Sequence, residues 1–150
     1  MEMKNENIPT LPRAAIELVP QRPPMLIVDR LISRDLGVNF SEVEALAPVE
    51  GIFIDEGNCL LPEYFIELVA QSMAAVNGYD GLVDGGEVGR GFLVGIEDFS
   101  WQGTAEPGEF LRIEMEKTFE FGPVTVMAGR VLNGSGDLLA TGELKVWEEK

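Results

Sequence analysis

Residues 61–78 read LPEYFIELVAQSMAAVNG, and this stretch decides the fold of the 150-residue chain. Proline at the second position suits the first turn of a helix, and Gly78 suits the end, so we expect one helix over 61–78. Apolar or small residues cover this helix on nearly every side, which is typical of a helix that is buried all round. In a chain of this length, such burial requires an element that wraps the helix, and a curved sheet would do so.

Two strand patterns and a short helix are expected before the central helix. Residues 12–19 (PRAAIELV) predict the short helix. Residues 25–32 (MLIVDRLI) are an apolar run rich in β-formers, and 38–47 (VNFSEVEALA) predict a second strand. The apolar contacts expected from this second strand are Val38, Phe40 and Val43. Residues 48–60 contain proline and glycine and predict a loop.

Four further strand patterns follow a glycine-rich loop, which is predicted over 78–91. The strands are expected at 91–101, 110–121, 124–132 and 138–147. Regular alternation in 110–121 predicts one apolar face, made of Leu111, Ile113, Met115, Phe119 and Phe121. Short turns favour antiparallel pairing. The pattern indicates one α+β domain over 1–150, in which a curved antiparallel sheet wraps a central helix, with residues 1–10 flexible.

The composition narrows the chemistry that the chain can perform. Acidic side chains outnumber basic ones by 26 to 11, so the net charge of −15 opposes binding to phosphate backbones and we expect no nucleic-acid partner. No run approaches ~18 apolar residues and the start lacks the core of a signal peptide, so no membrane span is expected and the cytoplasm is the default location. Histidine is absent, which removes histidine bases, histidine-activated nucleophiles and most zinc sites. We expect neither a metal nor a cofactor.

The positions of the cysteine and of the arginines support two further expectations. Cys59 is the single cysteine, which rules out an internal disulfide and fits a reducing compartment; we expect it to fill a small apolar space. Four of the seven arginines fall within 22 residues, and they form either a basic patch for an anionic partner or a scatter of solvated charges. These four are Arg13, Arg22, Arg30 and Arg34.

The central helix carries two charged residues, Glu63 and Glu67, and they form one polar stripe with Gln71 at i, i+4 spacing. Glu63 lies in the first turn, where the helix dipole favours an anion at the surface. Glu67 lies one turn further in, where a carboxylate is costly unless it is paired, protonated or facing a cavity. It is either a general acid or base, or a structural carboxylate bonded to Gln71, Gln21 or a backbone amide.

Two segments resemble a known enzyme family. Residues 20–30 (PQRPPMLIVDR) are similar to the Leu-Pro-His-Arg-x-Pro-Met-Leu-Leu-x-Asp-Arg signature of hot-dog 3-hydroxyacyl-acyl-carrier-protein dehydratases, and 65–75 (FIELVAQSMAA) resemble the helix motif of that family. The branch that is most similar is the dehydratase-like proteins of aryl polyene and related lipid clusters. Weaker similarity extends the resemblance over about 12–147, through the segments 91–95, 107–111 and 140–146.

The resemblance implies a hot-dog fold, a homodimer or higher even oligomer with an acyl tunnel at the interface, and an acyl-ACP or acyl-CoA substrate. It also implies a His–Glu pair that removes water from a 3-hydroxyacyl thioester in fatty-acid or polyketide-type metabolism. The acid is assigned to Glu67, whereas Gln21 stands at the histidine position of the Pro-His-Arg motif and has no titration near neutral pH. Substrate contacts are expected from Gln71, Arg22, Phe65 and Gly95.

Three functional hypotheses follow from the missing histidine. The first is a dehydratase in which Glu67 acts alone or with Asp55 or Glu56 in place of the base, although losing a general base commonly costs about 10²–10⁴ in rate. The second is an acyl-CoA or acyl-ACP thioesterase that uses Glu67 and needs no histidine. The third is a non-catalytic acyl-binding protein or partner subunit.

Overall fold

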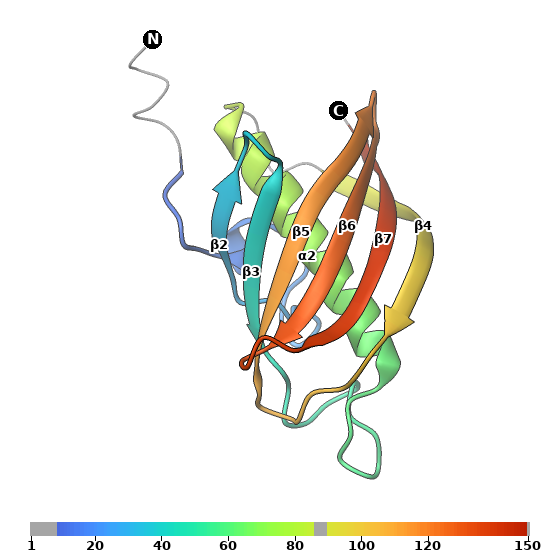
Figure 1. Cartoon of the computed structure of the whole chain (residues 1–150). Coiled ribbons are helices and arrows are strands. Elements are labelled where there is room, and N and C mark those ends of the chain that lie inside the picture. The colour runs from blue at the N-terminus through green and yellow to red at the C-terminus, as the bar shows by residue number, and fades with distance from the viewer. Residues whose placement is uncertain (1–8, 86–89, 150) are drawn as a thin grey trace.

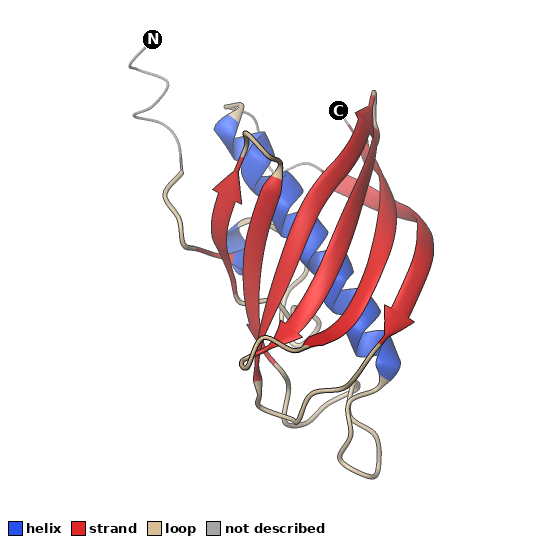
Figure 2. Ribbon diagram, viewed as in Figure 1, coloured by secondary structure: helices blue, strands red, loops and turns tan. Residues whose placement is uncertain are grey.

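The computed structural model describes residues 9–85 and 90–149. Within these ranges, seven antiparallel strands form one curved sheet that curls around the long helix α2 (Pro62–Val83) (Figures 1 and 2). The strand order is β1-β2-β3-β5-β6-β7-β4. The bounds are Arg13–Ala14 for β1, Arg30–Asp35 for β2, Phe40–Leu46 for β3, Arg90–Trp101 for β4, Phe110–Phe121 for β5, Val124–Asn133 for β6 and Leu138–Glu149 for β7. The central helix and the four C-terminal strands are confirmed. The flexibility predicted for 1–10 falls largely on residues 1–8, outside the described residues.

Helix α2 begins where the sequence predicts but ends later. It runs to Val83, so the prediction of a loop from Gly78 is wrong for the first six residues; residues 86–89 of that loop lie outside the described residues. Gly78 is a mid-helix residue because the backbone of Leu18 packs against it, with the carbonyl oxygen 2.0 Å from where a Cβ would be. The glycine therefore allows a close approach between the helix and the N-terminal segment.

The N-terminal third differs most from the prediction. Instead of a helix over 12–19, Arg13–Ala14 pair with β2, and one 3-10 turn follows at Ala15–Glu17. The reason is tertiary: the backbone N–H of Ala15 donates to the Asp29 carbonyl at 2.9 Å, which draws this segment to the sheet edge. The strand predicted over 25–32 begins only at Arg30, because a side chain of α2 binds the backbone before it.

Two predicted strand faces need correction. In β3 the inward residues are Ser41, Val43 and Ala45, whereas Val38 precedes the strand and is 65% exposed. In β5 the register shifts by one residue between Lys117 and Phe119, so the apolar face ends at Met115. A bulge of this kind turns the following side chains over. Phe119 and Phe121 are consequently exposed, and Lys117 points inward.

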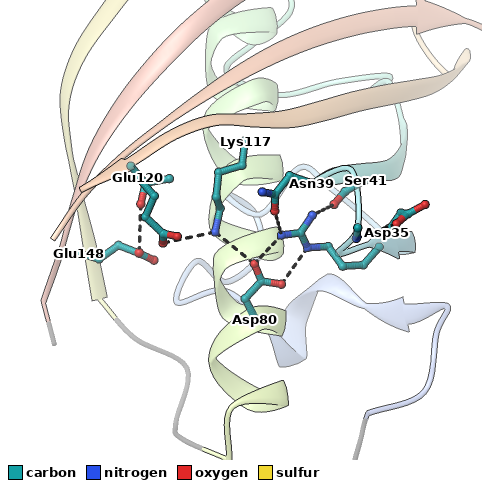
Figure 3. A network of polar contacts seen from close by, with 10 residues as sticks. Asp35, Asn39, Ser41, Asp80, Lys117, Glu120 and Glu148 are labelled. Atoms are coloured by element: carbon teal, nitrogen blue, oxygen red, sulfur yellow. Dashed lines mark hydrogen bonds and ion pairs between the residues drawn. The ribbon is translucent and has the colours of Figure 1, made fainter. Parts of the chain in front are cut away.

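An ion network holds the C-terminal half of α2 to the sheet (Figure 3). Asp80 of α2 accepts from Nε and Nη2 of Arg34 on β2, both at 2.8 Å, and from Nζ of Lys117 on β5 at 3.2 Å. The Arg34 and Lys117 side chains are only 1% and 8% exposed. Asn39 accepts another bond from Arg34 at 3.0 Å. The carboxylate thus compensates two buried cations, which would be costly without it.

Three further sequence expectations concern Cys59, the four N-terminal arginines and a membrane span. Cys59 is exposed in the loop before α2, so the apolar-filler prediction is wrong. The basic patch does not form as such, because Arg13 pairs with Glu17, Arg30 with Glu44 and Arg34 with Asp80. No helix in the described ranges is long and apolar enough to cross a membrane.

Candidate functional site

A cavity of about 200 Å³ lies between α2, the N-terminal segment and the strands β4 and β7. The face of α2 that lines it carries Glu67, Ala70, Ala74 and Asn77, which share one side of the helix at i, i+3, i+7 and i+10. The two alanines leave space between the carboxylate and the amide. The rest of the wall combines apolar and polar residues and consists of Leu18, Pro20, Gln21, Met73, Gly78, Leu93, Val146 and Glu148.

Gln71 holds the carboxylate of Glu67. Its Nε2 donates to Oε1 of Glu67 at 3.0 Å and to the carbonyl of Met25 at 2.8 Å, and its Oε1 accepts from the backbone N–H of Ile27 at 2.8 Å. The side chain is 1% exposed, and three bonds use both of its amide hydrogens and its oxygen. Of the three bonding partners considered for Glu67, Gln71 is the one that bonds it, and Gln71 positions the carboxylate rather than lining the cavity.

Gln21 lies in the same cavity as Glu67, whereas the other predicted contacts lie elsewhere. Arg22 is exposed and donates to the carbonyls of Val19 and Gln21, both at 2.8 Å. Phe65 is buried in the core, in edge contact with Tyr64, and Gly95 lies in β4. Neither Asp55 nor Glu56 lines the cavity; the Asp55 carboxylate accepts from backbone N–H groups of its own exposed loop.

Two polar residues of the cavity, Asn77 and Glu148, are absent from the sequence prediction. Asn77 is the polar residue that continues the Glu67 face of the helix at i+10, so helical spacing could have found it. Glu148 continues the inward series of β7 two residues after Val146, a signal that strand alternation carries. The Glu148 carboxylate accepts from the hydroxyl of buried Thr125 at 3.4 Å.

No histidine or metal cluster contributes to this arrangement. The sequence contains no histidine, and in the described part of the chain no three Cys, Asp or Glu side chains gather as metal ligands. What remains is one oriented carboxylate, two amides and a second carboxylate, together with apolar side chains, around one cavity. Such a site can bind an apolar group and exchange a proton at Glu67.

A curved antiparallel sheet around a single central helix, with a cavity along that helix, defines a hot-dog protein. Comparison with known proteins identifies the family within that class. The chain matches the ApeP-like family, described as ApeP dehydratase, over residues 13–150, and it belongs to this family. The hot-dog dehydratase resemblance of the sequence motifs is thereby confirmed.

Relatives in sequence and in structure agree with this assignment. The 3-hydroxyacyl-(acyl-carrier-protein) dehydratase FabZ of Erythrobacter litoralis is 32% identical over 106 residues, which cover 69% of this chain and 70% of the relative. The dehydratase heterocomplex ApeI:P from Xenorhabdus doucetiae contains a chain of the same fold, with a TM-score of 0.80, 21% identity and coverage of 95% and 93%. A hypothetical thioesterase with coenzyme A from Streptococcus pneumoniae is a more distant structural neighbour, with a TM-score of 0.58, 13% identity and coverage of 79% and 84%.

Proposed function

We propose that this chain binds the acyl part of a 3-hydroxyacyl thioester, presented by an acyl carrier protein or coenzyme A, in the cavity beside Glu67. The observation that carries the proposal is the placement of Glu67, a carboxylate oriented by Gln71 at the wall of a cavity that has both apolar and polar lining. The ApeP-like family and the FabZ relative support the substrate class.

In the proposed reaction, Glu67 is the acid and another chain supplies the base. Dehydration moves the C2 proton to a base and breaks the C3–O bond, and the hydroxyl leaves as water with a proton from the Glu67 carboxyl. Gln21 cannot take the C2 proton, because an amide has no suitable titration. Since the sequence contains no histidine, we propose that a histidine-bearing subunit completes the site, and the heterocomplex of the structural relative supports this arrangement.

The edge strand β4 is the proposed seam with a partner chain. It ends the sheet, spans 12 residues and exposes Leu93, Val94 and Ile96. An exposed apolar edge strand is a template for pairing with another chain. Leu93 also lines the cavity, so a partner strand at this edge would complete its wall. A second copy pairing at the same edge would give a homodimer, and a histidine-bearing relative would give the active pair.

Binding and turnover test different parts of the proposal. Titration calorimetry with a non-hydrolysable 3-hydroxyacyl-pantetheine should show binding to the wild-type chain and a loss of at least about 100-fold in Ala74→Phe, because the new ring would fill the cavity. Thermal unfolding of the variant is the control for folding. Equal binding by both proteins would move the acyl site away from this cavity.

Turnover is followed as hydration of an enoyl thioester. The chain alone should be slow, and addition of a histidine-bearing dehydratase subunit should raise the rate by about 10²–10⁴. In the mixture, Glu67→Gln on this chain should remove the gain. An unchanged rate in Glu67→Gln would show that this chain provides no acid.

Thioester hydrolysis is the second candidate, because a helix carboxylate can activate water without a histidine. The shared fold of the coenzyme A-bound hypothetical thioesterase is compatible with it. Release of free thiol from acyl-CoA, followed with a thiol dye, separates the two reactions. Thiol release that disappears in Glu67→Gln would favour the thioesterase, whereas enoyl hydration without thiol release would favour the dehydratase.

A further inference from the structure

Two carboxylates lie opposite each other at the open edge of the sheet, and the proposed reaction makes no use of them. Glu97 on β4 is directly opposite Glu143 on β7 in the antiparallel register, and Asp98 follows in the β4 bulge. Like charges opposite one another on neighbouring strands destabilise a sheet. Glu97 and Asp98 are exposed and Glu143 is partly exposed, so these charges act on any molecule that approaches this edge.

No cation in the described part of the chain forms an ion pair with these three carboxylates. Lys145 is the basic residue nearest to Glu143 along β7, two positions away and opposite Gly95. Neither Lys145 nor any described arginine approaches Glu97, Asp98 or Glu143 closely enough to form an ion pair. The repulsion between the opposed carboxylates is therefore not compensated within the chain.

Another pair of opposed carboxylates in the same sheet is compensated. Glu42 on β3 lies opposite Glu114 on β5, and Arg112 approaches the two carboxylates at 3.6 and 4.0 Å. Arg130 on β6 adds a contact to Glu114 at 3.3 Å. The sheet thus supplies cations where its interior strands oppose two acids, and it supplies none at the β4 edge.

The β4 edge independently indicates a protein partner. The strand at the other edge of the sheet, β1, has two residues, whereas β4 has 12 (Figure 1). Leu93 and Ile96 of β4 lie opposite Val146 and Leu144, on the side of the sheet that faces α2, yet they are 47% and 40% exposed. They are uncovered because β4 has no further strand beside it. A partner strand would supply both the backbone hydrogen bonds and the cover.

A second copy of this chain is a poor occupant of the edge. Each copy carries a net charge of −15, and a charge of this size opposes self-association. A two-fold interface presents the same patch from both subunits, so pairing β4 with β4 brings Glu97, Asp98 and Glu143 of both copies to one seam. Like charges at an interface reject a partner, whereas opposite charges favour it. A strand that carries Lys or Arg would compensate the three carboxylates.

We propose that the β4 edge selects a partner subunit whose own edge strand is basic, and that it disfavours a second copy of this chain. The apolar residues of β4 provide the contact, and Glu97, Asp98 and Glu143 provide the choice of partner. This inference rests on the proposed function, in which a histidine-bearing subunit pairs at β4, and it adds the charge of that subunit's edge strand.

A charge-reversed copy of this chain serves as the basic partner in the test. The double variant Glu97→Lys, Glu143→Lys keeps the apolar residues of β4 and replaces the opposed carboxylates by ammonium groups. Sedimentation velocity of fluorescently labelled wild type measures its association with unlabelled wild type and with the variant. At about 50 mM NaCl the mixed pair should associate at least about 10-fold more tightly, and most of this difference should disappear at about 500 mM, because salt screens exposed charges.

A matched control separates the β4 edge from the net charge of the chain. Glu50 and Glu56 are exposed in the loop before α2, outside β4 and β7. The double variant Glu50→Lys, Glu56→Lys changes the net charge by the same amount, and its association with the wild type should stay within about 2-fold of wild-type self-association. Thermal unfolding checks that both variants are folded. Self-association of the wild type, which should strengthen as salt is raised, needs no variant.

The outcomes separate this inference from the proposed function. If the wild type pairs with itself as tightly as with the β4 variant at low salt, or if the control variant pairs as tightly as the β4 variant, the choice of a basic partner is overturned. Wild-type self-association that weakens with salt would overturn it as well. None of these results changes acyl binding by the isolated chain, which calorimetry tests separately, so a failure of that binding is recognised as a failure of the proposed function.

Discussion

Gly78→Ala is the substitution that tests most directly how the N-terminal segment packs on α2. In an ordinary helix this change is favourable by about 1 kcal/mol, because alanine has the higher helix propensity. Here the added Cβ would lie 2.0 Å from the Leu18 carbonyl oxygen and 3.0 Å from its carbon, whereas an ordinary contact begins at 3.4 Å. The obstacle is backbone, so no side-chain rotation relieves it.

The expected net effect is a loss of stability. Overpacking commonly costs about 1–3 kcal/mol, and a rigid backbone obstacle places this site at the upper end of that range. After the gain in helix propensity, we expect the free energy of unfolding to fall by about 2 kcal/mol. For a chain of this size that is a decrease in Tm of about 4–8 °C.

Thermal and urea unfolding measure this difference, with Gly57→Ala as the matched control. Gly57 lies in an exposed loop, where a Cβ would meet its nearest neighbour at 3.4 Å, so that variant should be neutral or slightly stabilised. If Gly78→Ala were as stable as the wild type or more stable, Leu18 would not pack on α2 as described and the cavity wall formed by residues 18–21 would need revision.

Three further substitutions probe the ion network, the positioning amide and a titrating group. Asp80→Asn removes the negative charge that two buried cations share, so the free energy of unfolding measured in urea should fall by about 3–5 kcal/mol. The control Asp84→Asn, at an exposed position, should change it by less than about 0.5 kcal/mol. Equal effects of the two substitutions would refute the ion network. Gln71→Leu leaves backbone groups in 25–27 without hydrogen-bond partners, so the free energy of unfolding should fall by about 2–3 kcal/mol and amide hydrogen exchange should rise in that segment. Unchanged exchange there would show that Gln71 does not hold this segment. Burial raises the pKa of Asp29 above its ordinary 3.8, so ionisation of this carboxyl lowers the stability of the fold as pH rises through the folded-state pKa. The free energy of unfolding of Asp29→Asn, relative to the wild type, should therefore increase between acid and neutral pH, with no increase below 3.8. A difference that is constant with pH or that changes in the opposite direction would disprove this.

Local periodicity was enough to predict the central helix and the four strands that follow it. The helical pattern of 61–78 and the alternation of 110–121 are properties of adjacent residues, so they are readable without knowing the partner surfaces. The errors occur where a distant segment decides the local structure. Gly78 looks like a helix end, yet it is a mid-helix glycine because Leu18, 60 positions earlier in the chain, packs on it.

In the candidate site, too, the sequence revealed what depends on nearby residues and missed what depends on distant segments. Sequence spacing singled out Glu67 and its bond to Gln71, because both lie on one helix face at i, i+4. It also placed Gln21 at the histidine position of a dehydratase motif. It did not reveal Glu148, because the predicted strand ended at 147 whereas β7 continues to Glu149. It also did not reveal that Asp55 is engaged by its own loop, which depends on how the loop before α2 folds.

The sequence by itself determined that a buried helix carries Glu67 one turn beyond Glu63 and that no histidine accompanies it, because composition and helical period are fixed by the order of residues. Only the tertiary structure decided what that carboxylate faces. Gln21, Glu67 and Glu148 come from three separate segments of the chain, and they share a cavity because the sheet curls around α2 and brings β7 and the N-terminal segment to the same side of the helix.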